Sequence, residues 1–272
     1  VLKAGETISS RPGLSKVNAD HTWQAGNGES INQKCLATTR HYLVTGAGRT
    51  ATVWVTEPGQ RRAASENLGV SLKFLLDEFE ACARNATELV DPTFRDVMDA
   101  FWTGPCTKPF EGIHQQQCPR DGRPGCSIVD VLAQRGAAGK ATHFLSWTWS
   151  YRVSTMITAL RRWTSKTDVD PAQTFIWICF FVNNQYRILL EKSVMGSDDL
   201  GEIFGARLQH CGRVLVLLDS FKEPLYVQRV WCVYETYQAT RHKIPLEVIL
   251  PDTAFADLKE HLKAGRLDEI TR

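Results

Sequence analysis

A carboxylate next to an aromatic residue is the most suggestive chemical feature of this sequence. In the segment Arg229–Glu235 (RVWCVYE), helical spacing places Trp231 and Glu235 one turn apart, at i and i+4. The start of such a helix would face the polar ends of the neighbouring strands, which makes Glu235 the candidate catalytic group. The alternative, which the spacing alone favours, is an ion pair on a solvated face with Arg229, Lys222 or His242.

Polar side chains follow the ends of three predicted buried strands. In open α/β sheets, ligands bind at the carboxyl ends of the strands, where loops and helix N-termini converge. Three such ends together indicate a pocket, although at each single position the capping of the next helix is the simpler interpretation. The residues are Ser146, Trp147, Thr148 and Trp149 after the first strand, Asn183, Asn184 and Gln185 after the second, and Asp219 and Ser220 after the third.

Three other segments match known binding motifs only in part. Gly46–Ala51 fits the dinucleotide pattern G-x-G-x-x-A, but a strand pattern follows it where pyrophosphate binding needs a helix N-terminus. Gly136–Ala141 lacks the Ser or Thr of a phosphate-binding loop and precedes a strand, so we expect a turn. We expect no metal site, because no C-x-x-C pair occurs in the loop that holds Cys106, His114, Cys118 and Cys126.

The elements that must position these residues alternate regularly from residue 127 onward. Continuous apolar runs that alternate with amphipathic helices predict a parallel sheet covered on both faces, and thus an α/β fold. We expect helices at 128–132, 153–163, 200–211 and 227–239, and strands at 143–147, 174–182, 214–218 and 246–250.

The chain before residue 127 is less regular. Residues 1–40 are rich in Gly, Ser, Asn and Thr, and residues 42–44 and 51–55 fit a hairpin. Apolar residues from Leu68 to Ala83 recur at helical spacing, and a second helix is expected at 94–102. We therefore predict three parts: an irregular N-terminal extension (1–60), a helical lead-in with a Cys/Pro/Gly-rich loop (66–126), and the α/β domain (127–272).

Composition indicates which classes of partner to expect and in which cellular compartment the chain resides. The 272 residues carry a formal net charge of +2, which gives no strong attraction to nucleic acid. The longest apolar run, 175–182, is far shorter than the ~20 residues of a membrane span. The eight scattered cysteines fit reduced, intracellular thiols. Because the chain begins with Val1 and stops inside an amphipathic pattern, we expect an excerpt of a longer, cytoplasmic protein.

The order of these elements, with four of their motifs, resembles the Toll/interleukin-1 receptor (TIR) domain. It resembles more closely a divergent TIR-like group of algae and protists, which also has a lead-in like Cys126–Leu132 (CSIVDVL). The resemblance covers roughly residues 66–252 and implies a flavodoxin-like parallel sheet flanked by helices. The four motifs are FLSW at 144–147, FIWICFFVNNQ at 175–185, RVLVLLD at 213–219 and WCVYE at 231–235.

The resemblance implies that Glu235 cleaves NAD to nicotinamide and an ADP-ribose product, with NAD as substrate and no cofactor. Nicotinamide leaves as a neutral base, so one carboxylate suffices to stabilise the ribosyl cation. Aromatic faces suit the flat rings of NAD. The residues proposed to stack on these rings are Trp147, Trp149, Tyr186 and Trp231.

The resemblance also leaves a second hypothesis open. Trp147, Thr148 and Cys179 stand where the TIR-like group has His, Ala and an acidic residue. Many TIR domains serve only as assembly modules, so the alternative is a non-catalytic module that binds itself or other TIR-like domains.

Overall fold

The structure, a computed structural model, describes residues 58–102, 113, 115–191 and 200–266, together with the strands within residues 2–56. The chain divides into two compact units, residues 1–65 with 119–122 and residues 66–118 with 123–272. All of the candidate site residues lie in the second unit.

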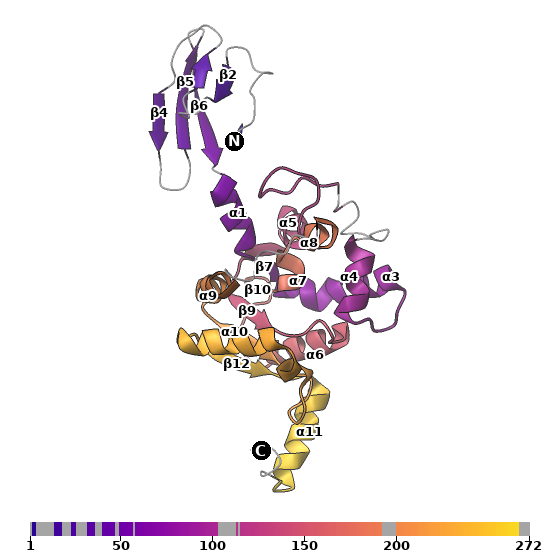
Figure 1. The fold of residues 1–272 in the computed structure, drawn as a ribbon. Coiled ribbons are helices and arrows are strands. Elements are labelled where there is room, and N and C mark those ends of the chain that lie inside the picture. The colour runs from indigo at the N-terminus through magenta and orange to yellow at the C-terminus, as the bar shows by residue number, and fades with distance from the viewer. Residues whose placement is uncertain are drawn as a thin grey trace. The chain divides into compact units, whose positions relative to one another are not determined.

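The first unit contains short strands and the helix α1 (Pro58–Glu66) (Figure 1). Its strands β5 and β6 pair antiparallel as a hairpin and contain the residues 42–44 and 51–55 for which we predicted one. The glycine-rich segment 46–51 is thus followed by a strand and not by a helix. The strands are β1 (Leu2–Lys3), β2 (Leu14–Val17), β3 (Trp23–Ala25), β4 (Asn32–Cys35), β5 (Arg40–Gly46) and β6 (Arg49–Thr56).

The second unit is built on a six-stranded sheet with the order β12-β11-β9-β10-β7-β8. The strands from β12 to β10 run parallel to one another, and β7 pairs antiparallel with β10 and β8. The predicted α/β fold with a flavodoxin-like, mostly parallel sheet is confirmed. The strands are β7 (Leu68–Ser71), β8 (Ala138–Lys140), β9 (His143–Ser146), β10 (Phe175–Trp177), β11 (Val214–Leu217) and β12 (Leu246–Ile249).

Helices flank this sheet, as Figure 1 shows. Helices α9 and α10 contact each other and β9, whereas α6 contacts β12 and α11. Among the described helices, none has the length and apolar character that a bilayer span requires. The helical segments are α2 (Leu72–Phe74), η1 (Leu75–Phe79), α3 (Glu80–Thr87), α4 (Phe94–Trp102), α5 (Ile128–Gln134), α6 (Val153–Thr164), α7 (Cys179–Val182), α8 (Gln185–Glu191), α9 (Leu200–Cys211), η3 (Leu225–Gln228), α10 (Val230–Arg241) and α11 (Asp252–Lys263).

Two predictions are wrong in neighbouring parts of the sheet, one at β10 and one at its antiparallel neighbour β7. The apolar run 174–182 is not one strand, because β10 ends at Trp177 and the short helix α7 begins at Cys179. A run buried on all sides gives no periodicity that separates strand from helix. Leu68, expected in a helix, begins strand β7. Gly69 allows this strand to approach β10, because a Cβ there would lie 2.8 Å from the carbonyl carbon of Phe175.

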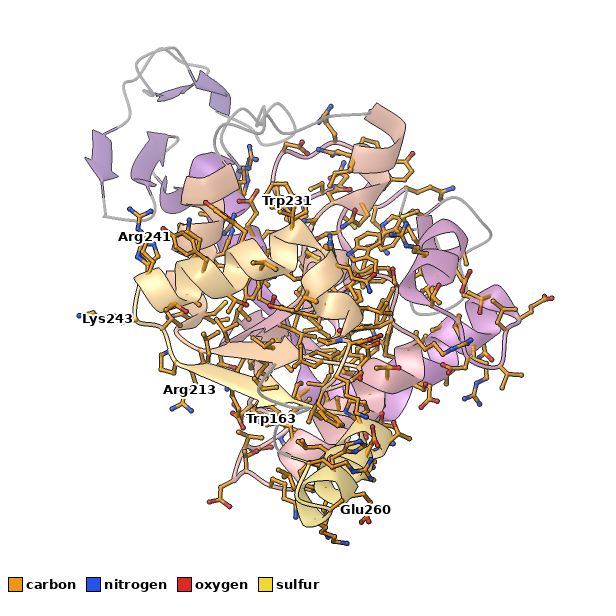
Figure 2. The ribbon with its side chains drawn as sticks, turned by 60° about the horizontal axis from the view of Figure 1, so that its bottom comes forward. Trp163, Arg213, Trp231, Arg241, Lys243 and Glu260 are labelled. Carbon is orange, nitrogen blue, oxygen red and sulfur yellow. The ribbon has the colours of Figure 1, made fainter. Side chains whose placement is uncertain are left out.

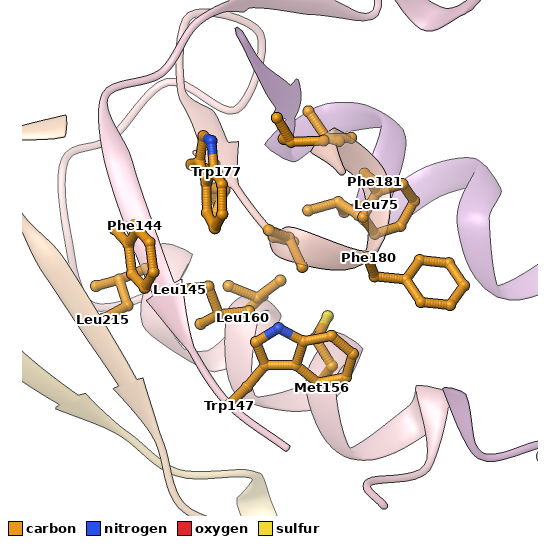
Figure 3. Packing of buried hydrophobic residues seen from close by; sticks show 14 of the residues in the cluster. Leu75, Phe144, Leu145, Trp147, Met156, Leu160, Trp177, Phe180, Phe181 and Leu215 are labelled. Atoms are coloured by element: carbon orange, nitrogen blue, oxygen red, sulfur yellow. The ribbon is translucent and has the colours of Figure 1, made fainter. Parts of the chain in front are cut away.

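An aromatic cluster fills the core beside the parallel strands. The ring of Phe79 contacts those of Phe94, Phe101, Phe180 and Phe181, with centroids 4.8–6.4 Å apart. Figure 3 shows Trp147 in the same cluster, and the indole is only 2% exposed. The residue that follows β9 is therefore part of the packing that fixes the end of that strand.

Candidate functional site

The site is centred on Ser146 and Glu235, which are 89 residues apart in the sequence and are brought together by the fold of the second unit. Ser146 is the last residue of β9, and all four residues of that strand are buried. Helix α10 begins directly after Arg229, which has an extended backbone, and contacts β9. Glu235 lies one and a half turns into α10 and is 8% exposed. The hydroxyl at the end of β9 and the carboxylate of α10 are thus in contact.

The carboxylate of Glu235 is held by one hydrogen bond. Ser146 Oγ donates to Glu235 Oε2 at 2.5 Å. Within the described residues, no basic nitrogen lies within 4.0 Å of this carboxylate, so the alternative ion pair with Arg229, Lys222 or His242 is not formed. Neither oxygen of Glu235 is among the fully buried side-chain atoms that lack a partner. Among the described residues, Oε1 has no hydrogen-bond partner and keeps some exposure to solvent.

Burial controls the charge of this carboxylate. Desolvation raises the pKa of Glu235 from its ordinary value near 4.5 to about 7, against smaller lowering effects of the Ser146 hydrogen bond and the Arg229 charge. A carboxyl group with a pKa near neutrality changes its charge in the range where cells work. Such a shift, in a group that is also hydrogen-bonded, is typical of functional carboxylates.

A chain of hydroxyl groups continues from Ser146 into the start of α10. The Tyr226 hydroxyl lies 2.6 Å from Ser146 Oγ, 2.7 Å from Thr236 Oγ1 and 2.9 Å from the Cys232 carbonyl oxygen. Tyr226 belongs to η3 and is 4% exposed, and burial raises its pKa. The phenol therefore stays protonated and neutral at any physiological pH.

Two cysteines and one arginine hold the chain just after β9. Cys232 Sγ and Arg229 Nη1 both donate to the carbonyl oxygen of Trp147, at 3.2 and 3.3 Å. Trp149 Nε1 donates to Cys179 Sγ at 3.5 Å. Burial raises the pKa of Cys232 to about 12, so this thiol remains a hydrogen-bond donor. These contacts fix α10 against the end of β9, and with it the position of Glu235.

The predicted site residues after β9, namely Trp147, Thr148 and Trp149, have different environments. Trp147 packs edge-on against Phe94, with ring centroids 4.3 Å apart, so its ring is occupied by the core. Trp149 is partly buried and lies nearly parallel to Trp147, at 6.4 Å and 14°. Thr148 is buried, and its hydroxyl oxygen accepts a hydrogen bond from the amide of Ser150 at 3.5 Å. Of the three, Trp149 is the residue with ring surface left for a ligand.

The residues predicted to follow the second strand directly are separated from that strand by helix α7. Asn183 follows α7 and not a strand, because β10 ends at Trp177. Asn184 Nδ2 donates to the carbonyl oxygen of Gly125 at 2.9 Å. The ring of Tyr186 lies against the same glycine, whose added Cβ would come within 2.4 Å of it. Asn184 and Tyr186 therefore hold the loop at Gly125 in place.

The last two predicted residues lie on either side of η3. Asp219 follows β11, and its Oδ1 accepts a hydrogen bond from the amide of Leu225 at 3.0 Å, which closes the turn before η3. Trp231 is 38% exposed and contacts the ring of Tyr234 edge-on. Figure 2 shows Trp231 in the first part of α10 and Arg241 at its end. Trp231 is thus an exposed aromatic one turn before Glu235, as the helical spacing predicted.

Sequence reasoning missed Tyr226 and Thr236. Residues 219–226 have no apolar period, and the helix expected at 227–239 begins only at Val230, because η3 and the extended Arg229 come before it. No spacing rule indicates that the hydroxyl of Tyr226 returns to the end of β9. Thr236 follows Glu235 directly, and only the helical assignment of α10 places its hydroxyl on the Tyr226 side.

No protein-family model, curated protein or solved structure matches this chain. Within the described residues, no group of three or more His, Cys, Asp or Glu side chains is placed to hold a metal ion. The chemistry of the site therefore has to be inferred from its own geometry.

Proposed function

We propose that this chain is a TIR-like signalling domain that cleaves NAD to nicotinamide and an ADP-ribose product, with Glu235 as the catalytic residue. The observation that carries the proposal is a single buried carboxylate, held by Ser146 at the carboxyl end of a parallel strand, with a pKa raised to about 7. The resemblance of WCVYE at 231–235 to the TIR motif supports the same residue.

Cleavage of NAD requires few catalytic groups from the protein. The bond between the ribosyl carbon and the nicotinamide nitrogen breaks, and its electron pair leaves with neutral nicotinamide, so no acid has to protonate the leaving group. The ionised Glu235 carboxylate stabilises the positive charge that develops on the ribose. Water then adds to the cation and loses a proton to solvent. Trp149, which is partly buried, and Trp231, which is 38% exposed, are two aromatic residues near this site that could stack on the bases of NAD.

Nicotinamide release by the purified protein tests the proposal. The protein is assayed dilute, concentrated and clustered on beads, since assembly is expected to favour turnover. Release by the clustered protein, lost in Glu235→Ala and kept in the exposed control Glu247→Ala, is the expected result. Absence of release in every assembled form, or equal release by Glu235→Ala, would remove the enzyme hypothesis.

A non-catalytic interaction module is the second candidate, and an exposed apolar surface favours it. Four aliphatic residues of η3 and α10 are 38–73% exposed: Leu225, Val227, Val230 and Val233. Contiguous exposed apolar side chains are typical of surfaces that bind other proteins. In a cytoplasmic protein, such a module would bind itself or other TIR-like domains. Self-association measured by sedimentation should then weaken in Val230→Asp and survive in Glu235→Ala.

A further inference from the structure

The hydroxyl of Tyr226 has more partners than it has protons. It lies within hydrogen-bond distance of Ser146 Oγ, Thr236 Oγ1 and the Cys232 carbonyl oxygen, and its ring is buried. A phenol carries one proton, so Tyr226 donates to only one of the three at a time. The acceptor to which Tyr226 donates depends on whether the neighbouring hydroxyl groups donate to it or accept from it.

With Glu235 ionised, the order of donors is fixed. The carboxylate only accepts, so Ser146 donates its single proton to Glu235 Oε2. The 2.6 Å contact between Ser146 and Tyr226 then requires Tyr226 to donate to Ser146. The Thr236 hydroxyl lies 2.7 Å from the Tyr226 hydroxyl and 3.1 Å from the Cys232 carbonyl oxygen and can donate to either, whereas the carbonyl receives no proton from Tyr226.

With Glu235 protonated, the order reverses. We place the proton on Oε2, the oxygen that contacts Ser146. The carboxylic acid then donates to Ser146, Ser146 donates to Tyr226, and Tyr226 donates to the Cys232 carbonyl oxygen. No hydroxyl loses its proton in this change. Two side chains, Ser146 and Tyr226, reorient their O–H bonds, and the only proton gained or lost is the one on Glu235.

We propose that Tyr226 is a positioning residue that orients Ser146 for both forms of Glu235. Its proton turns to Ser146 when Glu235 is ionised and to the Cys232 carbonyl when Glu235 carries a proton. The catalytic consequence rests on the proposed NAD cleavage, whereas the reorientation itself depends only on the site geometry.

Charged and titratable groups from each neighbouring element act on the same carboxylate. Arg229, at the start of α10, stabilises the ionised form of Glu235, and Ser146 of β9 does so through its hydrogen bond. Burial, and to a smaller extent ionised Glu235, raises the pKa of three neutral groups around it: Cys179 of α7, Tyr226 of η3 and Cys232 of α10. Since these three groups stay protonated, Glu235 is the group of this set that titrates near neutrality.

The wild-type protein allows a direct test by NMR, with ¹³C at the ζ carbon of its six tyrosines. The Tyr226 resonance should shift with pH at the same midpoint as the Glu235 carboxyl carbon, although the phenol itself stays protonated. That shift should vanish in Glu235→Gln. A wild-type spectrum in which no tyrosine follows the Glu235 midpoint would overturn the proposal, and this measurement needs no variant of Tyr226.

The variant Tyr226→Phe removes only the hydroxyl. The ionised form of Glu235 loses the donor behind Ser146, and hydrogen bonds to charged groups are stronger than neutral ones, so the pKa of Glu235 should rise by about one unit. Tyr237→Phe, on the same helix as Glu235, is the matched control, because Tyr237 is 57% exposed, and it should leave that pKa unchanged. An unchanged pKa in Tyr226→Phe would contradict the proposal.

The pH profile of nicotinamide release separates the two proposals. If NAD is cleaved and Tyr226 positions Ser146, the midpoint of the profile rises in Tyr226→Phe by the same amount as the pKa of Glu235. A raised pKa without any release leaves Tyr226 as a positioning residue and removes the hydrolase. Release that depends on Glu235, with the same midpoint in wild type and Tyr226→Phe, keeps the hydrolase and overturns the role of Tyr226.

Discussion

Glu235→Gln should make the protein more stable at pH 8 and change it little at pH 5. Burial raises the pKa of Glu235 from near 4.5 to about 7, so between these values the folded chain binds a proton that the unfolded chain releases. Stability contributed by this group therefore falls as pH rises through that range. A neutral amide of the same shape keeps the oxygen that Ser146 donates to and removes the charge.

The magnitude follows from the pKa change. Each pKa unit corresponds to about 1.4 kcal/mol, so the ionised side chain lowers the free energy of unfolding by about 3 kcal/mol at pH 8. At pH 5 the same effect is below about 1 kcal/mol, because Glu235 is protonated in the folded state. The difference, about 2 kcal/mol, corresponds to roughly 5–8 °C in Tm for a domain of this size.

Thermal unfolding of wild type and Glu235→Gln at pH 5 and pH 8 measures this effect. The comparison across pH cancels any contribution of the substitution that does not depend on charge. Glu247→Gln on the exposed face of β12 is the control and should show no such difference. Equal Tm changes at the two pH values would show that Glu235 is ionised in the folded protein throughout, and would refute the reasoning from burial.

Three further changes test the site and its support. Ser146→Ala removes the hydrogen bond that favours the ionised form of Glu235, so the pKa of Glu235 should rise by about one to two units. Carboxyl ¹³C NMR follows this pKa, and a value equal to or below that of the wild type would contradict the prediction. Trp147→Ala empties a core position and should lower the free energy of unfolding, measured with denaturant, by about 3–5 kcal/mol. Trp231→Ala changes an exposed position and should lower it by less than about 1 kcal/mol. Similar losses in the two variants would contradict the burial of Trp147 and the exposure of Trp231. Gly69→Ala sets a methyl group against the backbone of β10 and should cost about 1–3 kcal/mol by the same assay, and a neutral effect would show that β7 can move away.

Much of the α/β architecture was predictable because its strands are short apolar runs between clear turns. The strand at 143–146 and the helix at 153–164 lie where the pattern predicts them. The run 174–182 was not predictable in detail, since burial on all sides erases the difference between the period of a strand and that of a helix. There the structure has β10 and then α7.

Ser146 and Glu235 of the candidate site were predictable from the sequence, whereas Tyr226, which contacts Ser146, was not. Ser146 ends a buried strand and Glu235 lies in an amphipathic helix, and both signals are local. Tyr226 belongs to an irregular segment, and its hydroxyl reaches Ser146 only because η3 folds back over the end of the strand. The core position of Trp147 depends on α4 and α7, whose packing no local pattern reveals.

We propose that an ionised Glu235 carboxylate cleaves NAD, and the pH dependence of nicotinamide release is the decisive experiment for this proposal. The clustered wild-type protein should release nicotinamide at a rate that rises with pH to a plateau, with a midpoint near the pKa of Glu235, about 7. Glu235→Gln, which is expected to be folded and more stable at pH 8, should release none. Release by a folded Glu235→Gln protein, or no release by wild type at any pH, would contradict the account.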